Sequence, residues 1–331
     1  MNTNANPFQP VLDALLDEKK DLPKKYLQQF SDMRELELKT LMDIWSRIGL
    51  NRKLSLLEGL ETLAEGDTLV NFDDLAKALL NDPDSTVRGR AIRLLRESDD
   101  ARLVPTFINI LSTDAEVQTR AEAATALGVF VDLGELEEIP EAVKAQVEDS
   151  LLAAANGSDD VKVRRRALEA LGFSSRLEVQ TLIESSYQRE DPAWKTSALF
   201  AMARSADSRW DDNVLQSLAS ENRNVREAAV EAAGQLSIKL ASPLLLKMLE
   251  EEDDDDVVTA LIWSLSQVGG EDARTYIENL LDQTEDDEQI EFLEEALENL
   301  SFTDDLDKFE LLNFEPDFEL NEEEEDDEEE K

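Results

Sequence analysis

The sequence predicts an all-α protein, a right-handed α-solenoid of stacked helical hairpins with a disordered acidic C-terminal tail. Three observations predict this fold. A short motif recurs at nearly constant spacing along the 331 residues. Gly and Pro are few, at 11 and 9, which favours helices over turn-rich β structure. The last residues include nine consecutive acids, Glu322–Glu330, which cannot fold alone.

The recurring motif is an acidic or Asn-containing turn, then Val-Arg, small residues at helical spacing and Leu-Gly. It is clearest at residues 87–92, 119–128, 163–172 and 225–234. Its copies begin at positions 87, 119, 163, 194, 225, 257 and 289. All but one of the intervals are 31 or 32 residues, and the interval of 44 points to an insertion near residues 131–142, either a loop or a helix extension.

Each repeat is predicted to be a pair of helices. An apolar-periodic segment precedes each Val-Arg segment, and Asp, Asn, Ser or Pro usually separates the two. In the second helix, small and apolar residues fall within an arc of about 140°, at 100° per residue. A single hairpin cannot bury this stripe, but stacked hairpins can, so the repeats should form a one-dimensional array.

Three regions follow from this pattern. Residues 1–70 should form an N-terminal helical cap with a degenerate first repeat, with helices at 23–30, 31–48 and 52–64. Asp32 and Glu35 have the spacing of a capping box. Residues 71–302 should form an array of about seven repeats, and residues 303–331 the acidic disordered tail.

The period and the motif resemble HEAT repeats, specifically the phycobilisome-lyase HEAT-like class, over about residues 72–300. The resemblance implies that the second helices line a concave surface. It also implies that the Arg after Val pairs with an acid of a neighbouring repeat, forming a ladder. The ladder position is occupied by Arg88, Arg120, Arg164, Lys195, Arg226, Val258 and Ile290, so the ladder should lapse in the last two repeats.

Composition excludes several functions. The chain has no His and no Cys, which removes thiolate nucleophiles, Cys-bound metals and Ser-His-Asp triads. A net charge of −44 argues against nucleic-acid binding, which needs Lys and Arg to displace counterions. No phosphate loop or nucleophile elbow is present. We therefore expect no catalytic residues, no cofactor and no metal. The sequence also lacks a membrane span and a secretory signal, so we expect a monomeric cytoplasmic protein.

Candidate partner-binding residues are of two kinds. Outward-pointing arginines in the second helices and aromatic residues at outward or acidic positions have the properties of contact residues. Ion pairing to nearby acids, packing on a neighbouring repeat and docking of the tail segment as a cap are the alternatives. The candidates are Arg90, Arg93, Arg165, Arg166, Phe200, Trp263, Phe314 and Phe318.

The function expected from the sequence is a non-enzymatic scaffold or adaptor that holds a protein partner on its concave face. The acids favour a basic client and fast association, aided by the acidic tail. Two alternatives remain. Through the resemblance, the protein would be an accessory or subunit of a bilin lyase-like enzyme. Through its clustered acids, it would be an acidic chaperone or nucleic-acid mimic for a nucleic-acid-binding protein.

Overall fold

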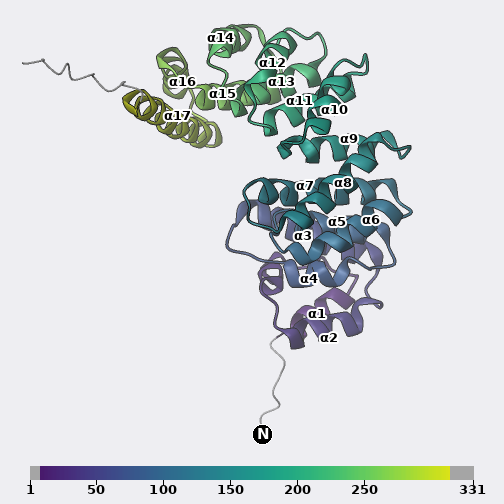
Figure 1. Cartoon of the computed structure of the whole chain (residues 1–331). Helices are drawn as coiled ribbons and strands as arrows, with labels where there is room; N and C mark the ends of the chain where they lie inside the picture. Colours follow the sequence, from purple (N-terminus) through teal and green to yellow (C-terminus); the bar gives the residue numbers. More distant parts are fainter. Residues whose placement is uncertain (1–7, 314–331) are drawn as a thin grey trace, which may run out of the picture. The chain divides into compact units, whose positions relative to one another are not determined.

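The computed structural model describes residues 8–313, and within that range every regular element is a helix (Figure 1). Phe314 and Phe318, two of the candidate contact residues, lie outside the described residues. The chain divides into two compact units. The first comprises Met1–Trp210 and Ser220–Ala228, and the second comprises Asp211–Ala219 and Ala229–Lys331.

The first unit begins with a helical cap. Its elements are α1 (Gln9–Leu16), η1 (Lys24–Phe30), α2 (Glu35–Trp45) and α3 (Leu50–Gly66). Helix α1 was not predicted, and its side chains Val11, Leu12 and Leu15 are buried. The capping box lies two residues later than predicted, at Arg34 and Glu37, and the amide of Arg34 donates to the Glu37 carboxylate at 3.2 Å. Asp32 instead adopts a left-handed conformation, with φ of 48°.

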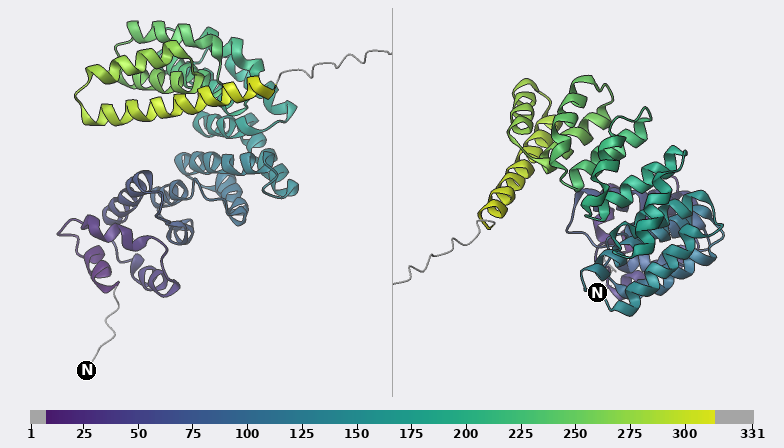
Figure 2. Two further views of the ribbon diagram at one scale, coloured as in Figure 1. Left: turned by 90° about the vertical axis from the view of Figure 1, so that its left-hand side faces the viewer. Right: turned by 45° about the horizontal axis from the view of Figure 1, so that its top comes forward.

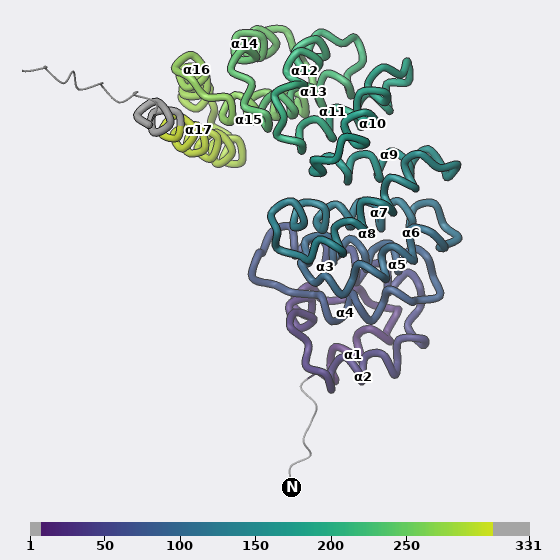
Figure 3. Tube along the Cα trace, viewed as in Figure 1, coloured from purple at the N-terminus to yellow at the C-terminus, as the bar shows by residue number. Residues whose placement is uncertain are grey.

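Four helical hairpins follow the cap in the first unit. Their helices are α4 (Asp73–Leu79), α5 (Ser85–Leu94), α6 (Val104–Thr113), α7 (Val117–Glu135), α8 (Glu141–Asn156), α9 (Val161–Ala170), α10 (Leu177–Tyr187) and α11 (Pro192–Arg204). The second helices α5, α7, α9 and α11 pack on one another in that order, and α3 packs on α5 (Figure 3). The second helices of the first unit therefore form one continuous layer, as the repeat pattern predicts.

The close approach of these helices depends on small residues. The Ala91, Ala123, Ala167 and Ala198 side chains at the equivalent buried position are entirely inaccessible. At Gly172 an added Cβ would lie 2.8 Å from the backbone of Ala201. The Ala and Gly residues of the motif thus set the distance between neighbouring repeats.

The insertion near residues 131–142 is a helix extension. Helix α7 has 19 residues, and α8 starts directly after Pro140. The extension is fastened to the next helix, because Lys144 pairs with Glu135 at 3.0 Å. Of the two readings of the sequence, the helical one is correct.

The second unit contains three further hairpins. Its helices are α12 (Asp211–Ser217), α13 (Arg223–Gln235), whose first residues belong to the first unit, α14 (Ser242–Glu251), α15 (Asp255–Val268), α16 (Glu271–Gln283) and α17 (Asp287–Asn313). Helix α17 lies alongside α15 and α16 (Figure 2). The fold is therefore an all-α solenoid of stacked hairpins, as predicted.

The last helix continues beyond the predicted end of the array at residue 302. Thr303 donates to the Ser266 carbonyl at 3.1 Å, and Asp304 pairs with Arg274 at 2.9 Å. Asp304 also accepts a hydrogen bond from the amide of Gly270, whose φ of 107° suits glycine. These contacts hold the first part of the predicted tail segment on the last repeat.

Candidate protein-binding surface

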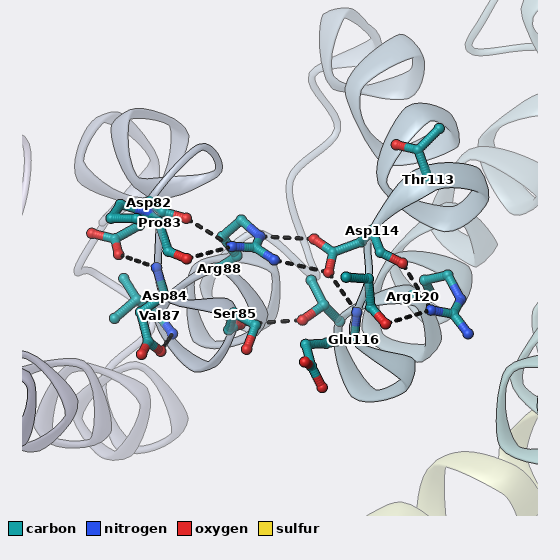
Figure 4. Close-up of polar contacts among 12 residues, drawn as sticks. Asp82, Pro83, Asp84, Ser85, Val87, Arg88, Thr113, Asp114, Glu116 and Arg120 are labelled. Atoms are coloured by element: carbon teal, nitrogen blue, oxygen red, sulfur yellow. Dashed lines mark hydrogen bonds and ion pairs between the residues drawn. The ribbon is translucent and has the colours of Figure 1, made fainter.

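The side chain after each motif Val fixes one repeat to the next in the first unit. Arg88 makes a two-pronged contact with Asp114, with Nε–Oδ2 and Nη2–Oδ1 distances of 2.7 and 2.8 Å (Figure 4). The same guanidinium donates to the Asp82 carbonyl at 2.8 Å. It therefore ties the turn of its own hairpin to the turn of the next one.

Arg120 repeats this arrangement one hairpin later. It contacts both carboxylate oxygens of Asp159, at 2.9 and 2.6 Å, and donates to the Asp114 carbonyl. The hydrogen bond from Arg120 lowers the pKa of Asp159. Burial acts to raise the pKa of Asp114, but hydrogen bonds from Arg88 and the Glu116 amide outweigh it and lower that pKa. Both aspartates are therefore held as carboxylates at neutral pH.

The ladder changes character further along. Arg164 donates to the Ala155 carbonyl at 3.1 Å and lies over the ring of Trp194. Lys195 lies over the ring of Tyr187, 5.0 Å from its centroid. Cation–π contacts thus stand where carboxylate pairs stood in the earlier repeats. Trp194 is buried, as its place at the motif Val position predicts.

Three adjoining hollows lie on the second-helix layer of the first unit. They have volumes of about 180, 140 and 270 Å³. Arg93 lines the first two hollows, Arg96 the first and third, and Gln118 the second and third. Because neighbouring hollows share these side chains, they form one groove, which we call the second-helix groove.

Arginines of α5 form the first part of this groove. Arg90 pairs with Glu61 at 2.8 Å and is only 18% exposed. Arg93 bridges Glu61 and Glu122, at 3.3 and 3.1 Å. These two predicted contact residues are thus already engaged with acids of the neighbouring repeats, and Arg93, at 30% exposure, is the more accessible of the pair.

The arginines of α9 lie further along. Arg166 pairs with Glu169 at 2.5 Å, and its side chain is 46% exposed. Arg165 donates to the hydroxyl of Ser197 at 2.9 Å, and that hydroxyl donates to Glu169 at 2.6 Å. The structure thus brings Arg165 and Arg166 together around one buried carboxylate.

Arg204 is a further cation of the groove that the sequence did not single out. It donates to the Glu169 carbonyl at 2.8 Å and lies over the Phe173 ring. Among the described residues, no carboxylate forms an ion pair with Arg204. Burial lowers the pKa of Arg204; the negative charge of Glu169 acts to raise it, and the positive charges of Arg166 and Arg96 act to lower it. Guanidinium groups from three repeats therefore face one another in the third hollow.

The sequence did not single out the acids of the groove as contact residues. Glu122 and Glu169 are buried, and Lys162 contacts the side chain of Gln118. The ion pairs of these acids join different positions of the repeat. Arg93, six residues after its motif start, pairs with Glu122, three residues after its own, and Arg166 pairs with Glu169 within one helix. The motif alone therefore did not predict them.

The two outward aromatics are half-buried and lie in different units. Phe200 belongs to α11 in the first unit, and Trp263 to α15 in the second. Trp263 packs against Phe292 of α17, with ring centroids 6.4 Å apart. Packing on the neighbouring repeat therefore accounts for part of the Trp263 surface.

The acid runs of the second unit lie in the turns between helices, where they reach from the end of α14 to the starts of α15 and α17. Asp254 caps α15 by accepting from the Val257 amide, and Asp286 accepts from the Gln289 amide at 3.0 Å. Negative charge at a helix N-terminus is favoured by the helix dipole. Within residues 8–313, no three acids converge as a metal site would require. In the same range, no helix has the length and apolar character to span a membrane.

Comparison with known proteins agrees with the architecture. A model of HEAT repeats matches residues 72–150 and 212–298. An uncharacterized phycocyanin operon protein Z of Pseudanabaena tenuis is 30% identical over 164 residues, which cover 49% of this chain and 78% of that protein. Among solved structures, YibA of E. coli matches with a TM-score of 0.43 and 17% identity, over 86% of this chain and 99% of its own.

Kap95p, in its structure with RanGDP, matches with a TM-score of 0.39 and 13% identity. That match covers 97% of this chain and 43% of Kap95p. The matched residues, the hairpins and the Val-Arg motif lead to one conclusion. This chain belongs to the HEAT repeat family.

Proposed function

We propose that this protein is a non-enzymatic scaffold that binds a protein partner on the second-helix layer of its first unit. The second-helix groove is the observation that carries the proposal. It spans successive repeats and is lined by charged side chains that neighbouring repeats hold in place. Ordered, partly exposed charges of this kind select a partner by electrostatic complementarity.

The contact residues we propose include Arg93, Arg165 and Arg166, with a smaller share for Arg90 because its side chain is only 18% exposed. Phe200, a half-buried aromatic of the same unit, would supply apolar contact area, and Trp263 would contribute separately from the second unit. Phe314 and Phe318 would contribute from outside the described residues. A basic client is supported by the acid runs at 250–256, 285–288 and 322–330.

Affinity capture with the full chain and with a chain lacking residues 321–331 tests the role of the acids at the C-terminus. If they recruit a basic client, removing them should abolish its capture and leave the melting temperature nearly unchanged, because a run of nine acids adds no core. Equal capture by both chains would dismiss the tail's part. A large drop in melting temperature would show that the run is structural. Capture of nucleic-acid-binding proteins in particular would favour the chaperone or mimic role.

An accessory role in bilin attachment is the second candidate, and the similarity to a phycocyanin operon protein supports it. Coexpression of this chain with a bilin and an apo-phycobiliprotein tests the role. Covalent attachment of the bilin that depends on this chain would establish the role. Attachment at the same low level with and without the chain would refute it.

A further inference from the structure

The third hollow of the second-helix groove carries a net positive charge. Its charged lining residues are four cations and two acids, Arg96, Lys162, Arg166, Arg204, Glu122 and Glu169, so its formal charge is +2. The first hollow has more acids than cations, and the excess therefore belongs to the third hollow and not to the groove as a whole. The net charge of −44 on the chain is screened beyond about 8 Å at physiological salt, so the local charge decides which ions enter.

The two acids of this hollow are already occupied. Glu122 pairs with Arg96 at 3.0 Å and accepts a hydrogen bond from the Gln118 amide at 2.6 Å. Glu169 pairs with Arg166 at 2.5 Å. Each carboxylate thus compensates one arginine of the hollow, and the other two cations are left without a compensating charge.

Those two cations are held in place by neutral groups. Arg204 donates to the Glu169 carbonyl at 2.8 Å, and its guanidinium carbon lies 5.2 Å from the centre of the Phe173 ring. Lys162 donates to the amide oxygen of Gln118. Neither cation forms an ion pair with a carboxylate of the described residues. Because the fold already positions both, their other N–H groups can donate to an anion at low reorganisation cost.

Repulsion among the cations of the hollow favours the entry of an anion. Burial has the largest effect on the pKa of Arg204 and lowers it; the charges of Arg166 and Arg96 act in the same direction, and the charge of Glu169 opposes them. Like charges that share a poorly hydrated site repel one another, and an anion between them removes that cost. The hollow therefore gains most from a ligand that contacts several of its cations at once.

We propose that the third hollow binds one phosphate group as a dianion, with Arg204 and Lys162 as its principal contacts. A dianion balances the formal charge of +2, whereas a single carboxylate leaves half of it. Phosphate oxygens point in several directions, which suits donors that come from separate helices, Lys162 from α9 and Arg204 from the end of α11. Arg binds phosphate through its fork of donors and Lys as a point charge. This inference goes beyond the scaffold function and does not depend on it.

Isothermal titration calorimetry of the full chain with sodium phosphate tests this inference, at constant ionic strength and at a pH where phosphate is a dianion. We expect saturable binding of one phosphate per chain and much weaker binding of acetate. Lys162→Gln and Arg204→Gln should each raise the Kd about tenfold, since each removes a charge-assisted hydrogen bond.

Lys247→Gln is the matched control variant, because it removes the same charge from a lysine of the second unit that is 68% exposed. It should leave the affinity unchanged. Lys162 is exposed, so its variant keeps the test valid if Arg204→Gln does not fold. Absence of saturation, acetate binding as tightly as phosphate, or an equal loss with Lys247→Gln would overturn the inference.

A short peptide with one phosphoserine, compared with its unphosphorylated form, identifies the source of the phosphate. If the phosphopeptide binds more tightly than inorganic phosphate and depends on Lys162, the site takes a phosphorylated side chain of a partner. If inorganic phosphate binds more tightly, with the same dependence, the site takes the free ion. If neither binds while the chain still captures a partner through this layer, the scaffold function stands and the phosphate site does not.

Discussion

Replacing Ala229 by aspartate is expected to lower the free energy of unfolding by about 3–5 kcal/mol, the cost of an unpaired buried charge. Ala229 lies in α13 and its side chain is entirely inaccessible. Its neighbours Ala228, Val230, Ala232 and Ala233 are also buried. The carboxylate would therefore lose its hydration with no partner supplied by the fold. Urea unfolding followed by circular dichroism measures the change.

Ala153→Asp is the control for this substitution. Ala153 is exposed in α8, so the same chemical change there costs only helix propensity, about 0.5–0.7 kcal/mol. If the two variants lost equal stability, Ala229 would not be at a tightly packed contact, and the predicted helix register of its repeat would be wrong.

Asp114→Ala should be the second most damaging change, with a loss of about 2–4 kcal/mol, since removing one partner leaves a poorly hydrated charge behind. Asp114 is 6% exposed and Arg88 16% exposed. Without Asp114 the Arg88 guanidinium keeps only its contacts to the Asp82 and Pro83 carbonyls. The thermal and urea unfolding of the variant would report the loss.

A double-mutant cycle that combines Asp114→Ala with Arg88→Ala measures the interaction energy between the two side chains, apart from what each contributes alone. A coupling energy above about 1 kcal/mol would identify a true link between repeats, whereas exposed pairs give less. The exposed pair Lys247–Glu251, at 3.8 Å, provides the comparison. A coupling for Arg88 and Asp114 no larger than for this exposed pair would show that the ladder does not fasten the repeats.

The repeat pattern predicted the hairpins because packing alone decides them. Each second helix has an apolar residue at its start, small residues one turn later and a further apolar residue after them. These form a stripe that only a neighbouring hairpin covers. The same logic placed Trp194 in the core, and the resemblance to HEAT repeats placed Arg88 and Arg120 in the ladder. Local patterns could not show that α17 continues past residue 302, because Thr303 contacts Ser266 of the preceding hairpin and Asp304 contacts Arg274, 30 residues away in the sequence.

The groove was harder to predict than the fold. The arginines of α5 and α9 were identified as outward-pointing residues. Arg166 pairs with Glu169 three residues away, but the partners of the others lie 26 to 32 residues away in the sequence. Arg204 drew no attention because it stands alone in sequence, and its importance arises from Arg96 and Arg166 facing it across repeats. Contacts between charged side chains of different repeats become clear only when the stacked hairpins are seen together.

The central claim is that the second-helix layer of the first unit holds a protein partner, and partner capture by charge-reversed chains tests it most directly. Lys162→Glu with Arg165→Glu alters the second helix α9 at positions without a carboxylate partner among the described residues, and Arg102→Glu with Arg209→Glu alters the same charge elsewhere. The account predicts that the first double variant loses the partner that the unaltered chain retains, while the second keeps it. Equal capture by both variants, with unchanged melting temperatures, would contradict the account.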